Sequence, residues 1–141
     1  RRIWNSEMSG PLTAFIEESY QDTLSLMTEL RDYLSEVQES ADSESDSETR
    51  ARIVREISSM TRQLTEAMAW LLLQKAAAAG EITGDEAHQR ADGLLTPDNP
   101  DQTPVPGGAA LPLEVRGYLD RSRRIYDQVL KLRDMTDTHP D

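Results

Sequence analysis

The sequence predicts an all-α protein: an antiparallel three-helix bundle with a short extra helix and a Pro-rich loop before the last long helix. Apolar residues recur at three- and four-residue steps over three long stretches, which is the period of an amphipathic helix. The apolar/polar alternation typical of strands persists nowhere. Aromatic residues make up only 5% of the chain, and the apolar positions are mainly Leu, Ile, Met and Val. At 141 residues the chain is expected to form a single domain over 1–141.

The first long helix is predicted over residues 11–38. Pro11 is tolerated at a first helical position, and Ser9 before it is a plausible cap. Acidic residues fill most of the outward positions, so this helix is expected to present an acidic surface. The predicted inward face consists of Ile16, Tyr20, Thr23 or Leu24, Met27, Leu30, Leu34 and Val37.

Residues 39–48 form an acidic, Ser-rich linker. The segment holds one alanine and otherwise only Glu, Asp and Ser, so it cannot bury apolar surface and repels itself. Its serines are either phosphorylation sites or parts of a plain polar linker, and the generic composition favours the plain linker.

The second long helix is predicted over residues 49–79 and stops at Gly80, a residue typical of helix C-termini. Its inward positions are Ile53, Ile57, Met60, Leu64, Ala67 or Met68, Leu71 and Gln74. In its last part the apolar residues surround the helix, because three contiguous leucines cannot all face one side. We therefore predict a combined core and dimer interface at Met68, Trp70, Leu71, Leu72 and Leu73.

A short helix is predicted from Thr83 to about residue 91. Thr83 and Glu86 have the spacing of a capping box, and Gly93 is positioned to end the helix. Residues 94–110 hold four prolines and are predicted to be an irregular loop. The ends of the chain, 1–10 and 135–141, are expected to be flexible.

The third long helix is predicted over residues 112–134. Its inward face consists of Val115, Tyr118 or Leu119, Ser122, Ile125 or Tyr126, Val129 and Leu132.

The net charge of −11 argues against general affinity for nucleic acid or anionic lipid, because phosphates repel the chain as a whole. The absence of cysteine excludes disulfides and thiolate metal sites. No signal peptide or membrane-spanning run is evident, so a soluble cytoplasmic protein is expected. The start at Arg1 rather than Met suggests a trimmed or engineered N-terminus.

The sequence offers little for catalysis or cofactor binding. The histidines are His88 and His139, and only His88 follows a carboxylate at helical spacing, namely Asp85. The serines have no partnered His and Asp in a recognisable order, and Gly107 and Gly108 lack the lysine of a phosphate-binding loop. We therefore expect no enzyme activity, no catalytic residues, no metal site and no cofactor.

Cationic faces remain as candidate binding surfaces on this acidic protein. Bases outnumber acids in residues 49–79, and arginines cluster on the last long helix. One interpretation is a solvated face that complements the acidic first helix; the other is a docking patch for an acidic partner. The candidate partner-binding residues are Arg52, Arg55, Arg62, Arg116, Arg121, Arg123 and Arg124.

Residues 68–76, Met-Ala-Trp-Leu-Leu-Leu-Gln-Lys-Ala, followed by Gly80 and Glu81, resemble the hallmark segment of the RcdA family of alphaproteobacteria. Residues 61–64, Thr-Arg-Gln-Leu, resemble the arginine-leucine stretch of that family. The last part of the sequence is similar to the C-terminal helix of the family, at Leu111, Pro112, Ser122, Tyr126, Val129, Leu132 and Arg133. The order of these elements agrees over most of the chain. The linker 39–48 and the loop 94–110 depart from the family pattern, so a partner surface can differ there.

The resemblance implies a dimeric three-helix bundle that acts as a non-enzymatic adaptor for the ClpXP protease. Such an adaptor presents cell-cycle regulators such as the response regulator CtrA, together with the response regulator CpdR and the cyclic-di-GMP effector PopA. The family has no catalytic residues to carry over. The alternatives are a structural or signalling bundle that binds a partner without a role in proteolysis, and a bundle that binds a small ligand or metal.

Overall fold

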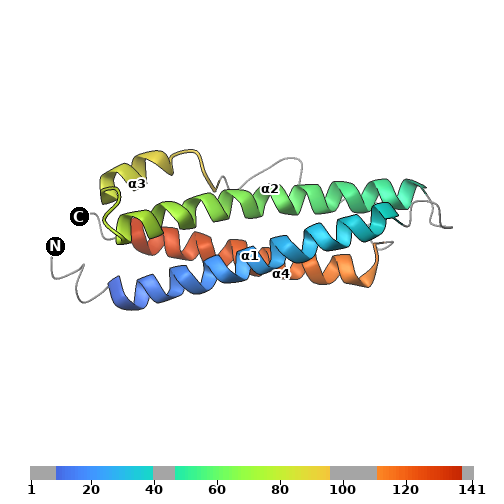
Figure 1. Ribbon diagram of the computed structural model, residues 1–141, viewed down its shortest axis with the longest axis horizontal. Helices are drawn as coiled ribbons and strands as arrows, with labels where there is room; N and C mark the ends of the chain where they lie inside the picture. The colour runs from blue at the N-terminus through green and yellow to red at the C-terminus, as the bar shows by residue number, and fades with distance from the viewer. Residues whose placement is uncertain (1–8, 40–46, 96–110, 138–141) are drawn as a thin grey trace.

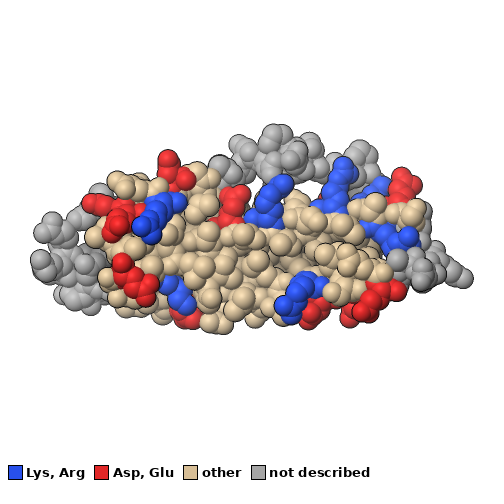
Figure 2. Space-filling view, turned by 45° about the horizontal axis from the view of Figure 1, so that its top comes forward, with Lys and Arg blue, Asp and Glu red and all other residues tan. Residues whose placement is uncertain are grey.

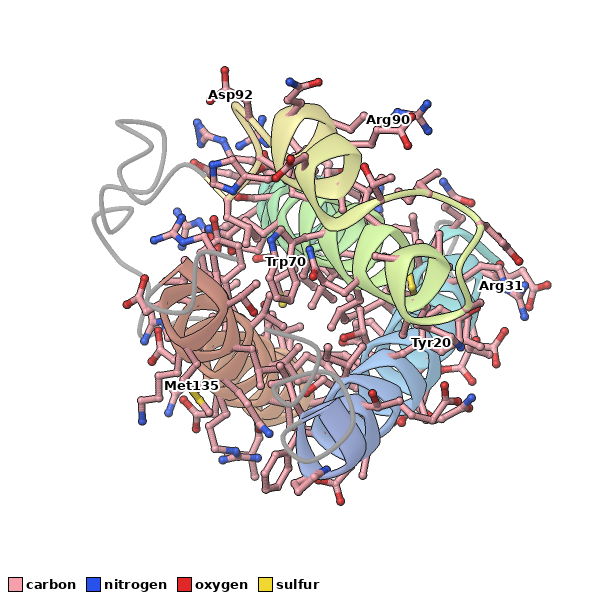
Figure 3. The ribbon with its side chains drawn as sticks, turned by 90° about the vertical axis from the view of Figure 1, so that its left-hand side faces the viewer. Tyr20, Arg31, Trp70, Arg90, Asp92 and Met135 are labelled. Atoms are coloured by element: carbon pink, nitrogen blue, oxygen red, sulfur yellow. The ribbon has the colours of Figure 1, made fainter. Side chains whose placement is uncertain are left out.

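The computed structural model describes residues 9–39, 47–95 and 111–137, which contain four helices and no strand. The helices are α1 (Ser9–Glu39), α2 (Ser47–Ala78), α3 (Gly84–Arg90) and α4 (Leu113–Asp137). The all-α prediction is confirmed. Three long helices lie side by side, and the short α3 packs on the outside of α2 (Figures 1 and 3).

The helix directions differ from the strictly antiparallel prediction. One core cluster joins the start of α1 to the ends of α2 and α4, through Ile16, Leu71 and Val129. Hence α1 is antiparallel to both other long helices, whereas α2 and α4 run parallel (Figure 1). The physical reason is the length of the connection over residues 79–112, since a long crossover can return the chain to the end where the preceding helix began.

The core consists of two apolar clusters, one in each half of the molecule. The positions predicted for α2 are buried as expected, including Ile57 and Leu64. On α1 the predicted Ile16, Thr23 and Leu30 are buried. Leu26, which was not predicted, is also fully buried, whereas Leu24, the alternative to Thr23, is 43% exposed. Because α1 packs against two helices, α2 and α4, its buried face is broader than one seam and takes in Leu26.

Leu95 is a core residue that the sequence analysis assigned to the Pro-rich loop. Its side chain is fully buried, and its φ of 60° is unusual for a residue with a Cβ. Its backbone N–H donates to Glu66 Oε1 at 2.9 Å, and its carbonyl accepts from Arg133 Nη1 at 3.2 Å. These two bonds tie the chain after α3 to α2 and α4, so Leu95 is anchored on the core.

The local signals around α3 are confirmed. The Thr83 hydroxyl accepts from the Glu86 N–H, and the Glu86 carboxylate accepts from the Thr83 N–H, both at 3.0 Å. Gly80 has a φ of 80° at the end of α2, where the Gly80 and Glu81 N–H groups satisfy carbonyls of the last turn. Gly93 also has a positive φ of 88°.

Several predicted boundaries shift. α1 begins at Ser9, and α4 continues to Asp137, so the described parts of both expected flexible ends are helical. Glu39 ends α1 and Ser47 begins α2, so the described residues of the predicted acidic linker are helical. Residues 1–8, 40–46, 96–110 and 138–141 lie outside the described residues, so the rest of those predictions stays open.

We expect Leu64→Ala to lower the free energy of unfolding by about 2–5 kcal/mol, because it leaves a cavity in a fully packed core. Leu113→Ala is the matched control, since Leu113 is 79% exposed and its truncation should cost less than about 1 kcal/mol. Urea denaturation followed by circular dichroism compares the two variants. Equal losses would contradict the core assignment.

Candidate protein-interaction surfaces

The five residues predicted as core and dimer interface are divided by the fold. Trp70 and Leu71 are buried within one chain, where they pack with residues of α1 and α4 and with Leu95. Met68 and Leu73 are partly buried, and Leu72 is 46% exposed. Part of the apolar circumference of α2 is covered by α3 and the residues after it, so of this set Leu72 is the side chain most available to a partner.

Leu72 lies three residues before Lys75, which contacts Tyr20 of α1, so helical spacing places Leu72 beside the seam of α1 and α2. We define an apolar strip here by its residues: Tyr20, Leu24, Thr28, Thr65, Met68 and Leu72. Tyr20 and Met68 are partly exposed, and both leucines are more than two-fifths exposed. Figure 2 shows an uncharged band on this side of the molecule, bordered by basic and acidic side chains.

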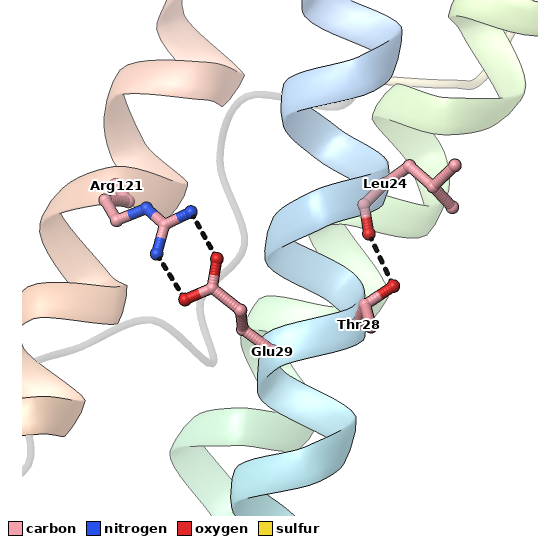
Figure 4. Close-up of polar contacts among 4 residues, drawn as sticks. All are labelled: Leu24, Thr28, Glu29 and Arg121. Carbon is pink, nitrogen blue, oxygen red and sulfur yellow. Dashed lines mark hydrogen bonds and ion pairs between the residues drawn. The ribbon is translucent and has the colours of Figure 1, made fainter.

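The two threonines of this strip do not offer their hydroxyl protons to a partner. The Thr28 hydroxyl donates to the Leu24 carbonyl at 2.9 Å (Figure 4). The Thr65 hydroxyl donates to the Thr61 carbonyl at 2.7 Å. Each hydroxyl proton is thus used within its own helix.

One end of the strip is closed by Lys75. Its ammonium lies 2.8 Å from a Glu17 carboxylate oxygen and 3.9 Å from the centre of the Tyr20 ring. The ion pair and the cation–π contact join the end of α2 to the start of α1. The hydrogen bond from Lys75 also holds the pKa of Glu17 below its ordinary value.

Arg121 is engaged within the chain. Its two terminal nitrogens donate to the two carboxylate oxygens of Glu29, at 2.8 Å and 2.9 Å (Figure 4). This bidentate pair joins α4 to α1, and it holds the pKa of the Glu29 carboxyl below its ordinary value. Arg121 therefore fits the interpretation in which the cationic face complements the acidic first helix, rather than the one in which it docks an acidic partner.

The other predicted arginines are distributed over several faces. Arg55, Arg62, Arg123 and Arg124 are exposed and form no ion pair with any described residue. Arg52 and Arg116 each take part in interactions. The arginines of α4 do not form one patch, because neighbouring helical residues point about 100° apart: Arg124 lines the seam with α1 and Arg123 points away from it.

A hollow of about 330 Å³ lies in the seam between α1 and α4. It is lined by Asp22, Ser25, Arg121, Arg124, Ile125 and Gln128. The sequence analysis named two of these residues, the arginines, as candidate binding residues, and Ile125 only as an alternative inward position. The others were missed because α1 and α4 are far apart in sequence, and no local pattern shows which of their faces meet.

The described ranges contain no group of three or more His, Cys, Asp or Glu that could hold a metal ion. None of the helices in those ranges has the length and apolar character that a membrane span needs.

The Glu29–Arg121 pair predicts a pH dependence of stability. Because the folded-state pKa of Glu29 is lowered, the stabilisation is present above its ordinary pKa of 4.5 and is lost as the pH falls through the lower folded value. Glu29→Gln should therefore destabilise near neutral pH by about 0.2–1 kcal/mol, the range for an exposed pair, and this difference should vanish in acid.

Denaturation curves of both proteins at neutral and acidic pH measure this difference. Asp120→Asn is the control, because Asp120 is an exposed acid of α4 that pairs with no described residue. A Glu29→Gln effect that stays constant down to strongly acidic pH would rule out the ion pair as its source.

Comparison with known proteins places the chain in a family. Residues 11–141 match the model of a family described as "Protein of unknown function (DUF1465)". No curated protein and no solved structure matched the chain. Since the match extends from the start of α1 to the last residue, the chain belongs to the DUF1465 family.

Proposed function

We propose that the protein is a non-enzymatic adaptor, a three-helix bundle that promotes regulated ClpXP proteolysis of cell-cycle regulators such as CtrA. The structural observation that carries the proposal is the combination of a packed helical scaffold with exposed apolar side chains and four exposed arginines that form no ion pair with the described residues. An adaptor needs surfaces for more than one protein on a rigid support. This chain offers candidates at its α1–α2 and α1–α4 seams.

The link to proteolysis rests on the resemblance of residues 68–76 and of the last helix to the RcdA family. In this proposal the protein works in the cytoplasm with ClpX, the response regulators CtrA and CpdR, and the cyclic-di-GMP effector PopA. The exposed arginines of α2 and α4 are the proposed contacts for acidic partners, namely Arg55, Arg62, Arg123 and Arg124. Arg121 is left out of this set, because Glu29 already satisfies its guanidinium.

A second candidate is a structural or signalling bundle that binds a partner protein without a role in proteolysis. It is supported by the same exposed surfaces, which fit any protein partner of suitable shape and charge. The two candidates differ in what happens to the partner after binding.

The lifetime of the cargo separates the two candidates. We expect deletion of the gene in its source organism to lengthen the half-life of a CtrA-type response regulator, and the unaltered gene to restore it. The half-life is measured by immunoblotting after protein synthesis is stopped. Capture with a catalytically dead ClpP should recover ClpX and the regulator together with this protein. An unchanged half-life would contradict the adaptor and favour the scaffold.

We also propose that the protein forms a homodimer through the α1–α2 strip. With a net charge of −11, two copies repel each other unless the surfaces in contact are uncharged. The strip is an uncharged band with two exposed leucines, so a second copy can cover it without burying an unpaired charge (Figure 2).

The dimer proposal predicts that Leu72→Glu lowers the molar mass measured by light scattering from twice the chain mass of 15.9 kDa toward the chain mass itself. The reason is that a carboxylate would be buried in an apolar contact. Leu113→Glu, at an exposed leucine away from the strip, should leave the mass unchanged. A monomer at micromolar concentration for the unaltered chain would overturn the proposal.

A further inference from the structure

The α1–α4 seam carries a second exposed surface, distinct from the α1–α2 strip. Phe15 on α1 is 48% exposed, and Met135 on α4 is 49% exposed. Met135 lies on the outer side of α4 in the view along the helices (Figure 3). Neither side chain was singled out by the sequence pattern, and neither is needed to fill the core.

Helix geometry places these two residues on the same groove as the polar hollow. Phe15, Asp22 and Glu29 follow one another at seven-residue steps on α1, and so do Arg121, Gln128 and Met135 on α4. Residues seven apart lie on nearly the same line of a helix. Since the helices are antiparallel and Glu29 pairs with Arg121, the two lines face each other along the seam.

Distances along this groove follow from the helical rise of 1.5 Å per residue. Phe15 and Met135 are both fourteen residues from the ion pair, so they lie at the same level. Asp22 and Gln128 lie about 10 Å further along the groove, and Arg124 lies about 16 Å from the apolar pair. The lining of the hollow by Asp22, Gln128 and Arg124 agrees with this arrangement.

Several polar groups of the hollow are available for hydrogen bonds or ion pairs with a ligand. The Arg124 guanidinium, the Gln128 amide and the Ser25 hydroxyl make no hydrogen bond to any described residue. Asp22 forms no ion pair or hydrogen bond with the described residues either, although its charge acts on the nearby Arg121. Asp22 and Arg124 therefore carry charges of opposite sign that form no ion pair with the described residues, about 6 Å apart along the groove.

We infer that the α1–α4 groove binds a helical segment of a partner protein that presents an apolar, a basic and an acidic side chain on one face. The apolar side chain packs on Phe15 and Met135. The basic one pairs with Asp22, and the acidic one pairs with Arg124. On a partner helix these spacings correspond to about seven and eleven residues, which bring all three side chains to the same face.

Charge complementarity defines the partner helix. Asp22 needs a basic side chain and Arg124 an acidic one, so a uniformly acidic or uniformly basic helix satisfies only one of the two. A helix with both signs at the stated spacing satisfies both groups and fixes the register of binding. This inference deepens the proposed function, because it names the surface and the chemistry of a partner.

The test uses the full chain and a displayed library of alanine-rich helical peptides, about 20 residues or three heptads long. Leu occupies the first position, and the positions seven and eleven residues later are randomised among Lys, Glu and Gln. We expect enrichment of Lys at the first randomised position and Glu at the second. Fluorescence anisotropy of the enriched peptide then measures its affinity for each variant.

Charge exchange provides the decisive variants. Arg124→Glu should weaken binding of the enriched peptide roughly tenfold or more and should change the residue selected eleven positions after Leu from Glu to Lys. Asp22→Lys should change the residue selected seven positions after Leu from Lys to Glu. Arg31→Glu is the matched control, because Arg31 is an exposed arginine on the side of α1 turned away from α4 (Figure 3), and it should change neither affinity nor selection. Circular dichroism confirms that each variant remains helical.

Selection without charge preference, or a preference that Arg124→Glu leaves unchanged, would overturn the inference. So would a peptide that dissociates a dimer of the chain, because a second copy would then occupy the groove. The selection involves no protease, so its failure would leave the cargo half-life result standing. Likewise, an unchanged half-life would leave the peptide result standing.

Discussion

The apolar surface of α2 is the constraint on which the other helices depend. Its buried line extends from Ile53 to Leu71, and α1, α3 and α4 all contact it. In its last part this surface is too wide for one neighbouring helix to cover. Trp70 faces the cluster shared with α1 and α4, while α3 and the chain that leads to Leu95 cover a further side. The short helix and the bonds that anchor Leu95 are consequences of that width.

Placing α4 parallel to α2 also decides which charges are available for binding. The parallel course brings Arg121 opposite Glu29, so a cationic residue that looked suited to a partner serves the fold instead. Its neighbours Arg123 and Arg124 are turned to different sides, and only Arg124 reaches the α1–α4 hollow. Arginines that are clustered in the sequence thus lie on separate surfaces, because a helix distributes successive residues around its axis.

The two seams of α1 suit different partners for a physical reason. Along α2 the seam is apolar, and its threonine hydroxyls bond to their own helices, which favours a contact without charges. Along α4 the seam carries a charge of each sign that forms no ion pair with the described residues, beside two exposed apolar side chains, which favours a partner with a defined register. The adaptor proposal requires that two partners bind at once, and the two seams are the surfaces proposed for them.

The sequence by itself determined the helical class, the buried line of α2, the capping box at Thr83 and the stop at Gly80. These features depend on local periodicity and on the backbone preferences of single residues, and both can be inferred from a short stretch of sequence. Tertiary structure alone decided the direction of α4, the burial of Leu26 and Leu95, the exposure of Leu24 and the pairing of Glu29 with Arg121. Those features depend on which faces meet across long sequence separations, and the helical period states only that a face is apolar, not which helix covers it.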